Sequence, residues 1–133
     1  MTRERKKGFT LIELLIVMVI IGLLASLVAP TMFSKVSSSK VKTAEAQMDL
    51  LSTSLDAYRL DIGAYPEKLN ELRESSKELW DGPYIQKKIP NDPWGNSYVY
   101  ALSTGSYPYV LKSLGADGEE GGNDENADIS YFE

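Results

Sequence analysis

The feature that most constrains the fold of this chain is an almost wholly apolar run of twenty residues, from Leu14 to Phe33. At about 1.5 Å of rise per residue, a helix of that length spans roughly 30 Å, the thickness of the hydrocarbon core of a bilayer. Two other interpretations stay open, because the core helix of a soluble domain or a cleaved secretory signal is also apolar. A core helix of a soluble domain would normally show one polar face, and the apolar part of a secretory signal is normally shorter than this run. The run therefore predicts a membrane-spanning helix, with Pro30 as a point where it could kink or locally melt.

Charge is unevenly distributed along the chain. The overall net charge is −5, but residues 1–8 carry a local net charge of +3 and residues 9–133 carry −8. Basic residues beside an apolar span stay in the cytoplasm, so this asymmetry predicts a cytoplasmic start and an acidic body across the membrane. An acidic body lacks the basic face that phosphate binding requires, which argues against nucleic acid as a partner.

The chain contains no cysteine and no histidine. Disulfides, thiol nucleophiles, thiolate metal sites and histidine-based acid–base or zinc chemistry are therefore excluded. Serine and aspartate are present, but without histidine they cannot form the usual hydrolase triad. No phosphate loop or dinucleotide fingerprint occurs either. We therefore expect that the protein is not an enzyme.

One carboxylate, Glu13, lies at the start of the apolar segment, within "GFTLIE". An ionised side chain in a membrane is costly and usually functional, although a carboxylate in the first turn could also reach the headgroup level. The motif resembles the processing site of the type IV pilin superfamily, in which a prepilin peptidase cuts after the glycine and methylates the new first residue. The resemblance implies cleavage after Gly8, methylation of Phe9, and an assembly role for Glu13 opposite the N-terminal amine of a neighbouring subunit.

A second helical pattern follows the apolar run. Apolar or small residues recur at alternating spacings of three and four, which form one stripe of an amphipathic helix, and Gly63 with Pro66 predicts its end. The stripe could be a coiled-coil seam. Because the chain that follows is too short to build a core without it, we expect the stripe to pack on a small domain instead. The stripe consists of Val41, Ala44, Met48, Leu51, Leu55, Tyr58 and Ile62.

The region after Pro66 mixes a helical pattern with strands and turns. Leucines at positions 69, 72 and 79 lie among charged residues and predict a short helix. Residues 99–102 and 107–111 are rich in aromatic and β-branched residues and predict two strands, joined by a turn at Thr104–Ser106. The fold class is therefore α+β, with a small antiparallel sheet packed against the long helix.

Two further motifs narrow the resemblance. The stretches "DPWG" at Asp92–Gly95 and "SLGADG" at Ser113–Gly118 are similar to motifs of the major pseudopilins of type II secretion systems. The resemblance implies a type IV pilin-like fold with three parts. These are a leader peptide at 1–8, a transmembrane or filament-core helix at 9–33, and a periplasmic head at 34–133 that includes an amphipathic helix at 34–62 and a C-terminal calcium loop at 113–129.

Six carboxylates crowd the segment from Asp117 to Asp128, among three glycines. Hard cations such as calcium prefer six to eight oxygen ligands, although the segment is not an EF-hand, because it lacks the glycine and the distal glutamate of that loop. A solvated acidic tail stays open as the alternative. The pseudopilin resemblance implies a structural calcium ion instead. Its implied ligands are Leu114 (through its carbonyl), Asp117 and Asp128, with Asp124, Glu125 and Asn126 competing for the middle places and Ser113 as a weaker candidate.

The same resemblance implies a function and a set of partners. The chain would be the major structural subunit of a pseudopilus, a helical periplasmic filament that drives export of folded exoproteins. Its partners would be other copies of itself, the prepilin peptidase, minor pseudopilins, an inner-membrane assembly platform and, before assembly, membrane lipid. It would cross the inner membrane once, with its head in the periplasm. A type IV pilin or minor pseudopilin of a related filament, and a membrane-tethered calcium-binding or sensory module without a filament, stay open as alternatives.

Overall fold

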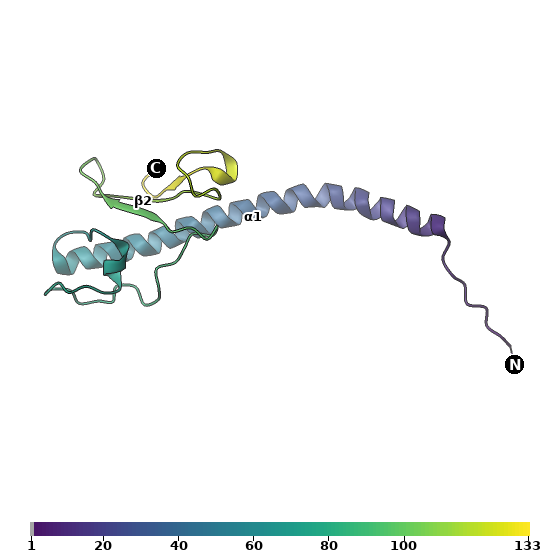
Figure 1. Ribbon diagram of the computed structural model, residues 1–133, viewed down its shortest axis with the longest axis horizontal. Helices are drawn as coiled ribbons and strands as arrows, with labels where there is room; N and C mark the ends of the chain where they lie inside the picture. The colour runs from purple at the N-terminus through teal and green to yellow at the C-terminus, as the bar shows by residue number, and fades with distance from the viewer. Residues whose placement is uncertain (1) are drawn as a thin grey trace. The chain divides into compact units, whose positions relative to one another are not determined.

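The computed structural model describes residues 2–133, as one long helix, two short 3-10 helices and three strands (Figure 1). By their contacts these residues form two compact units, the first ending at Val36 and the second running from Ser37 to Glu133. The elements in chain order are α1 (Leu11–Ile62), η1 (Leu69–Leu72), β1 (Val99–Leu102), β2 (Tyr109–Ser113), η2 (Asp124–Asn126) and β3 (Ile129–Ser130).

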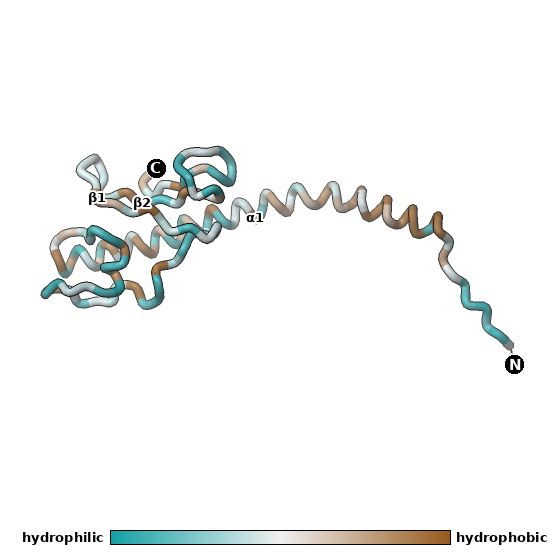
Figure 2. Tube along the Cα trace, in the orientation of Figure 1, coloured by the Kyte–Doolittle hydropathy of each residue, from teal (hydrophilic) through white to brown (hydrophobic). Residues whose placement is uncertain are grey.

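The first unit consists of a non-helical N-terminal segment and the apolar part of α1, which is coloured brown in Figure 2. Pro30 lies inside α1 without ending it. The hydroxyls of Ser26 and Thr31 donate to the carbonyls three residues earlier, at 2.7 and 2.8 Å. These polar groups are thus satisfied within the helix, as a lipid environment requires. By length and composition, α1 is able to cross a membrane.

The second unit is built on the amphipathic part of α1. Five members of the predicted stripe, Ala44, Met48, Leu51, Leu55 and Tyr58, are at most 1% exposed. They form the core together with residues of the sheet and of the segment that follows α1. The stripe therefore packs on a head domain, as expected, with Val41 and Ile62 at its two ends only partly buried.

The sheet is antiparallel, with β2 between β1 and β3. Its register pairs Tyr100 with Leu111 and Lys112 with Ser130. Alternate residues of β2, namely Tyr109, Leu111 and Ser113, are buried toward the core. The α+β class with a small antiparallel sheet is therefore confirmed. The third strand was not predicted, because two residues are too few to show an alternating pattern.

Between α1 and β1 the chain has less regular structure than its leucine spacing suggested. The predicted helix is limited to the four residues of η1, and Leu79 is 67% exposed. Polar contacts of the Glu71 side chain, and not a longer helix, fix the conformation of this segment. The Glu71 carboxylate accepts hydrogen bonds from the backbone N–H groups of Glu67 and Lys68 at 2.8 and 3.1 Å, and lies 3.0 Å from the ammonium of Lys77. Local polar contacts thus replace the helical hydrogen bonds that the leucine pattern had predicted.

Candidate functional site

The predicted processing site lies in the non-helical segment that precedes α1. Gly8 is exposed and three residues ahead of the first helical residue, and Phe9 is 86% exposed. A Cβ atom built on Gly8 would meet no other atom within 4 Å. The peptide bond between these two residues is therefore open to a protease, and it is not held in helical hydrogen bonds.

Glu13 takes part in a reciprocal cap at the start of α1. The backbone N–H of Thr10 donates to Glu13 Oε2 at 3.0 Å, and the backbone N–H of Glu13 donates to Thr10 Oγ1 at 3.2 Å. This is a capping box, which satisfies two donors that a helix N-terminus leaves open. The sequence reasoning missed it, although the signal, Thr-x-x-Glu directly before an apolar run, is present in "TLIE".

Among residues 2–133, no other part of the protein covers the apolar side chains of the first unit. The large hydrophobic residues from Leu11 to Phe33 are all half or more exposed. A continuous apolar surface of this kind marks a membrane or protein contact. The unit is thus suited to lipid, to other copies of the same helix, or to each in turn.

The acidic C-terminal loop is folded tightly at two glycines. Gly115 has a φ of +74°, and a Cβ atom there would lie 2.7 Å from the carbonyl oxygen of Glu125. Gly122 has a φ of +103°, and a Cβ atom there would lie 2.5 Å from the carbonyl oxygen of Asn126. Only glycine tolerates both the backbone angle and the close approach. The backbone N–H of Ala116 closes the loop by donating to Glu125 at 2.8 Å.

The predicted calcium ligands are all in or beside this loop, but their side chains have different partners. Asp117 accepts a hydrogen bond from the backbone N–H of Glu119 at 3.1 Å, and Asp128 accepts one from that of Gly121 at 3.1 Å. The carboxylate of Glu125 accepts a hydrogen bond from the hydroxyl of Ser37 on α1. Leu114 is half-buried between β2 and the loop, and Asp124 and Asn126 lie in η2.

One carboxylate oxygen of Asp128 is in an environment that suits a bound cation. Its Oδ1 atom is buried and has no hydrogen-bond partner among residues 2–133, which is a costly state for a carboxylate. Across the same residues, no three acidic side chains are close enough together to hold a metal ion. Further ligands would therefore have to include loop carbonyls, which calcium accepts readily. In its chemistry, this donor set fits a hard cation.

A buried hydrogen-bond cluster connects the "DPWG" turn to the base of this loop. Asp92 Oδ1 accepts the backbone N–H groups of Trp94 and Asn96 at 3.1 and 2.8 Å. Its Oδ2 accepts a hydrogen bond from the hydroxyl of Ser113 at 2.7 Å, and Asn96 Nδ2 donates to the carbonyl of Gly115 at 3.2 Å. The hydroxyl of Ser113, the weaker ligand candidate, is thus turned to Asp92 and to the N–H of Gly115.

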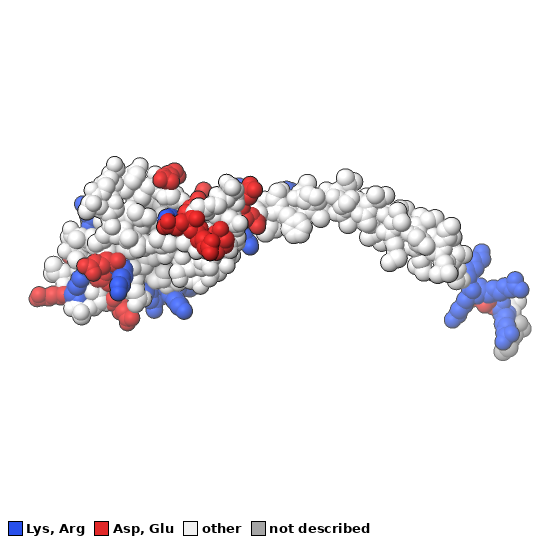
Figure 3. All heavy atoms as spheres, turned by 45° about the horizontal axis from the view of Figure 1, so that its top comes forward, with Lys and Arg blue, Asp and Glu red and all other residues white. Residues whose placement is uncertain are grey.

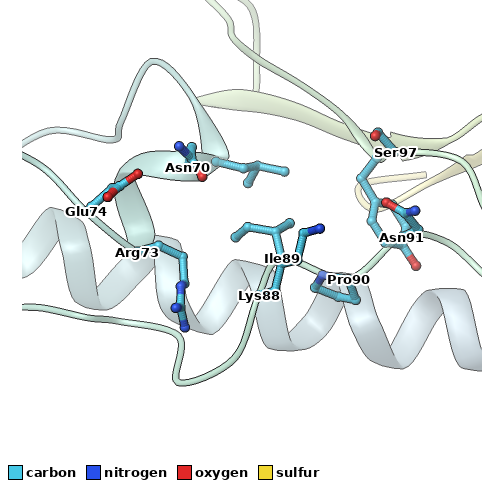
Figure 4. Close-up of a pocket in the computed structure, with 10 residues that line it drawn as sticks. Asn70, Arg73, Glu74, Lys88, Ile89, Pro90, Asn91 and Ser97 are labelled. Atoms are coloured by element: carbon cyan, nitrogen blue, oxygen red, sulfur yellow. The ribbon is translucent and has the colours of Figure 1, made fainter.

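A groove of about 670 Å³ lies beside η1 (Figure 4). Arg73 is one of its lining residues, and its guanidinium donates to the backbone carbonyl of Gln86 at 2.7 Å, which fixes that segment in place. Lys88, Glu74 and Asn91 also line the groove. None of the residues singled out in the sequence as functional belongs to it.

An apolar helix after a short basic segment, continued by a small α+β head, is typical of one class of protein, the pilin-like filament subunits. Residues 3–29 match the family model described as the prokaryotic N-terminal methylation motif. Residues 31–132 match the model described as type II secretion system protein G. The chain belongs to the type II secretion system protein G family.

Similar proteins agree with this assignment over nearly the whole chain. The type II secretion system core protein G of Pseudomonas aeruginosa is 40% identical, over 100% of this chain and 99% of that protein. The protein of the same name from Vibrio cholerae is 38% identical, over 99% and 96%. The crystal structure of the major pseudopilin from the type 2 secretion system of enterohaemorrhagic Escherichia coli has a TM-score of 0.60 and 27% identity. It covers 74% of this chain and 90% of that one. The predicted resemblance to major pseudopilins is confirmed.

Proposed function

We propose that this chain is the major structural subunit of a type II secretion pseudopilus, and that it acts as a building block and not as an enzyme. Copies of it would polymerise into a periplasmic filament that drives export of folded exoproteins across the outer membrane. The observation that carries the proposal is the uncovered apolar part of α1 behind an accessible Gly8–Phe9 bond, in a member of the protein G family. A subunit that leaves its longest apolar surface exposed requires lipid first and other subunits later.

The proposed sequence of events starts in the inner membrane. The basic residues 1–8 stay in the cytoplasm, α1 crosses the bilayer once, and the acidic head lies in the periplasm. A prepilin peptidase then cuts after Gly8 and methylates Phe9. The carboxylate of Glu13 would next leave its own cap and neutralise the new amine of Phe9 on a neighbouring subunit. Each ion alone is costly in lipid, so pairing the carboxylate with the amine would lower that cost and favour assembly.

The proposed partners follow from this sequence of events. They are further copies of the chain, the prepilin peptidase, minor pseudopilins, an inner-membrane assembly platform and, before assembly, membrane lipid. The family assignment supports a subunit of the filament body, and it does not favour a type IV pilin or a tip subunit.

Processing is tested by replacing Gly8 with alanine in the full-length protein. Intact mass and N-terminal sequencing should show N-methylated Phe9 as the first residue of the wild type, and an attached leader in the Gly8→Ala protein. Negative-stain microscopy should then show filaments only for the wild type. Gly22→Ala is the matched control for processing and should be cut and methylated like the wild type, because a Cβ atom there meets open space in the single chain and the residue lies far from the cut site. A Gly8→Ala protein of normal mature mass that still supports secretion would refute the proposal.

We also propose that the C-terminal loop binds a structural calcium ion. One support is the buried Asp128 Oδ1, which has no hydrogen-bond partner among residues 2–133. The other is the repulsion expected among the carboxylates of the loop, which are red in Figure 3. A bound ion would neutralise these charges and tie the loop to the end of β2. The chain has no cysteine, so the ion would also restrain the C-terminal region in the way that a disulfide could. The ligands would be Leu114, Asp117 and Asp128, with Asp124, Glu125 and Asn126 as further donors.

Calcium binding is tested by thermal unfolding of the full-length protein in detergent, with calcium or with a chelator. A ligand that binds only the folded state stabilises it, so calcium at 100 times its Kd should raise the Tm by about 5 °C or more. Asp117→Ala and Asp128→Ala should lose this response. Asp49→Ala, which removes an exposed carboxylate from α1, should keep it. Identical melting curves of the wild type with calcium and with chelator would rule the site out.

A further inference from the structure

Lys112 is a cation already placed at the acidic loop. It lies on β2, and its Nζ is 3.2 Å from Glu120 Oε1 and 3.9 Å from Asp128 Oδ2. The side chains of Lys112 and Asp128 are only 21% and 24% exposed, whereas that of Glu120 is 78% exposed. The ammonium donates a hydrogen bond to the exposed Glu120. It also lies within ion-pair distance of Asp128, whose less solvated carboxylate is screened less by water.

The carboxylate of Asp128 presents two different oxygens. Its Oδ2 is occupied by the backbone N–H of Gly121 and faces Lys112, whereas its buried Oδ1 has no partner within the described chain. A dication drawn to Oδ1 would share this carboxylate with the ammonium of Lys112. Two cations on one half-buried carboxylate repel each other, and the repulsion is stronger there than in bulk water.

We propose that Lys112 is the built-in counter-cation of the acidic loop and that it competes with calcium for Asp128. The inference rests on the proposed calcium site and adds to it a residue that lowers its affinity. Without calcium, the ammonium offsets the charges of Glu120 and Asp128. When calcium binds, the ammonium has to move away.

The surroundings of Lys112 allow that movement. Lys112 and Asp128 both line a cavity of about 280 Å³, which is also lined by Tyr107, Ser130 and Phe132. The lysine side chain is a flexible four-carbon stem with a compact charge, so it reaches water by rotation of its own bonds. Its displacement requires no change in the register of β2 with β3, since that register depends on backbone hydrogen bonds.

The test is calcium titration by calorimetry of the full-length protein in detergent, for the wild type, Lys112→Met and Lys112→Arg. We expect Lys112→Met to lower the Kd for calcium about tenfold, because the competing charge is gone. In chelator, the Tm of the same variant should fall below that of the wild type, because Glu120 and Asp128 lose their counter-cation. Lys112→Arg keeps the charge and should behave like the wild type in both measurements. A merely structural role of the stem would lower the Tm of Lys112→Met without raising its affinity for calcium.

Lys87→Met is the matched control, since it removes an exposed lysine elsewhere on the head and should change neither value. If the wild type binds calcium and Lys112→Met binds it with the same Kd, the competition is refuted while the calcium site stands. If neither protein binds calcium, the calcium site and the competition both fail. If only Lys112→Met binds, the lysine blocks the site in the wild type, which supports the inference.

Discussion

At the scale of single residues, Glu13 illustrates how one carboxylate can serve two states of the protein. In the single chain it caps α1 together with Thr10, which satisfies a backbone donor at the helix start. In the proposed filament the same carboxylate meets the amine of Phe9 from another copy. The cap keeps the carboxylate hydrogen-bonded while the subunit waits in the membrane, so its cost there is lower than that of a free charge.

Glu71 is a second residue whose charge is expected to affect the head. Burial by itself would raise its pKa, but the hydrogen bonds from Lys77 and from the backbone N–H groups of Lys68 and Glu67 outweigh burial and lower the pKa below its usual value of 4.5. The unfolded chain then binds the proton more readily than the folded one. The stability from ionised Glu71 is therefore fully present above about pH 4.5 and is lost as the pH falls through the lowered pKa.

We expect Glu71→Gln to lower the free energy of unfolding by about 1–3 kcal/mol at pH 7, because charge-assisted hydrogen bonds become neutral ones. The difference from the wild type should shrink as the pH drops below the lowered pKa. Thermal unfolding of the full-length protein in detergent, followed by circular dichroism across this pH range, measures both effects. Glu74→Gln, on the same segment but exposed, is the control. A difference that does not vary with pH would contradict the role given to the charge.

At the scale of elements, the "DPWG" turn supports the C-terminal loop. Asp92 is 4% exposed and accepts three hydrogen bonds, two from its own turn and one from Ser113 at the end of β2. Asn96 extends the connection to the carbonyl of Gly115. The turn and the loop, some twenty residues apart in sequence, are thereby one hydrogen-bonded unit.

We expect Asp92→Ala to lower the free energy of unfolding by about 2–4 kcal/mol, because it leaves a buried hydroxyl and two backbone donors without an acceptor. It should also speed amide hydrogen exchange at residues 115–118. Denaturant unfolding and exchange measured by mass spectrometry check these two effects. Asn91→Ala removes one exposed hydrogen bond of 3.3 Å and should change stability by less than about 0.5 kcal/mol. Unchanged exchange in Asp92→Ala would show that the loop base does not depend on the turn.

At the scale of the whole molecule, the head contains its own core. Every residue of the buried core cluster lies between Met48 and Leu111, and the partly buried residues packed against it extend only to Phe132. Of the described residues 2–36, none belongs to this core. The membrane part of α1 therefore contributes length and apolar surface to the molecule, while the packing that stabilises the fold is confined to residues 37–133.

We accordingly expect a fragment of residues 37–133 to stay monomeric in water without detergent and to unfold in one cooperative transition. Its Tm should lie within a few degrees of the head transition of the full-length protein in detergent, because the same apolar contacts are buried in both. Near-ultraviolet circular dichroism and calorimetry measure this. A fragment with helical signal but no cooperative transition would show that residues before Ser37 are required for packing.

The sequence alone predicted the parts that depend on local pattern and composition. The apolar run, the amphipathic stripe and the α+β class were predicted from hydropathy period, because such patterns mark which surface a helix or strand must bury. The motif around Gly8 and Phe9 was identified by resemblance, and cleavage there stays a prediction. The two-residue strand β3 and the short extent of η1 were not predicted. A strand of two residues has no period, and the leucines at 69, 72 and 79 suggest a longer helix than the local polar contacts allow.

Only the tertiary structure decided how residues distant in sequence meet. It pairs Asp92 with Ser113 and Lys112 with Glu120 and Asp128, and it leaves Asp128 Oδ1 buried without a hydrogen-bond partner in the described part of the chain. The acidic loop was visible in the sequence as a cluster of charges, but the partner of each charge was not. Those partners depend on which side of β2 each side chain faces and on where the loop returns to the sheet, and both are set by long-range strand pairing.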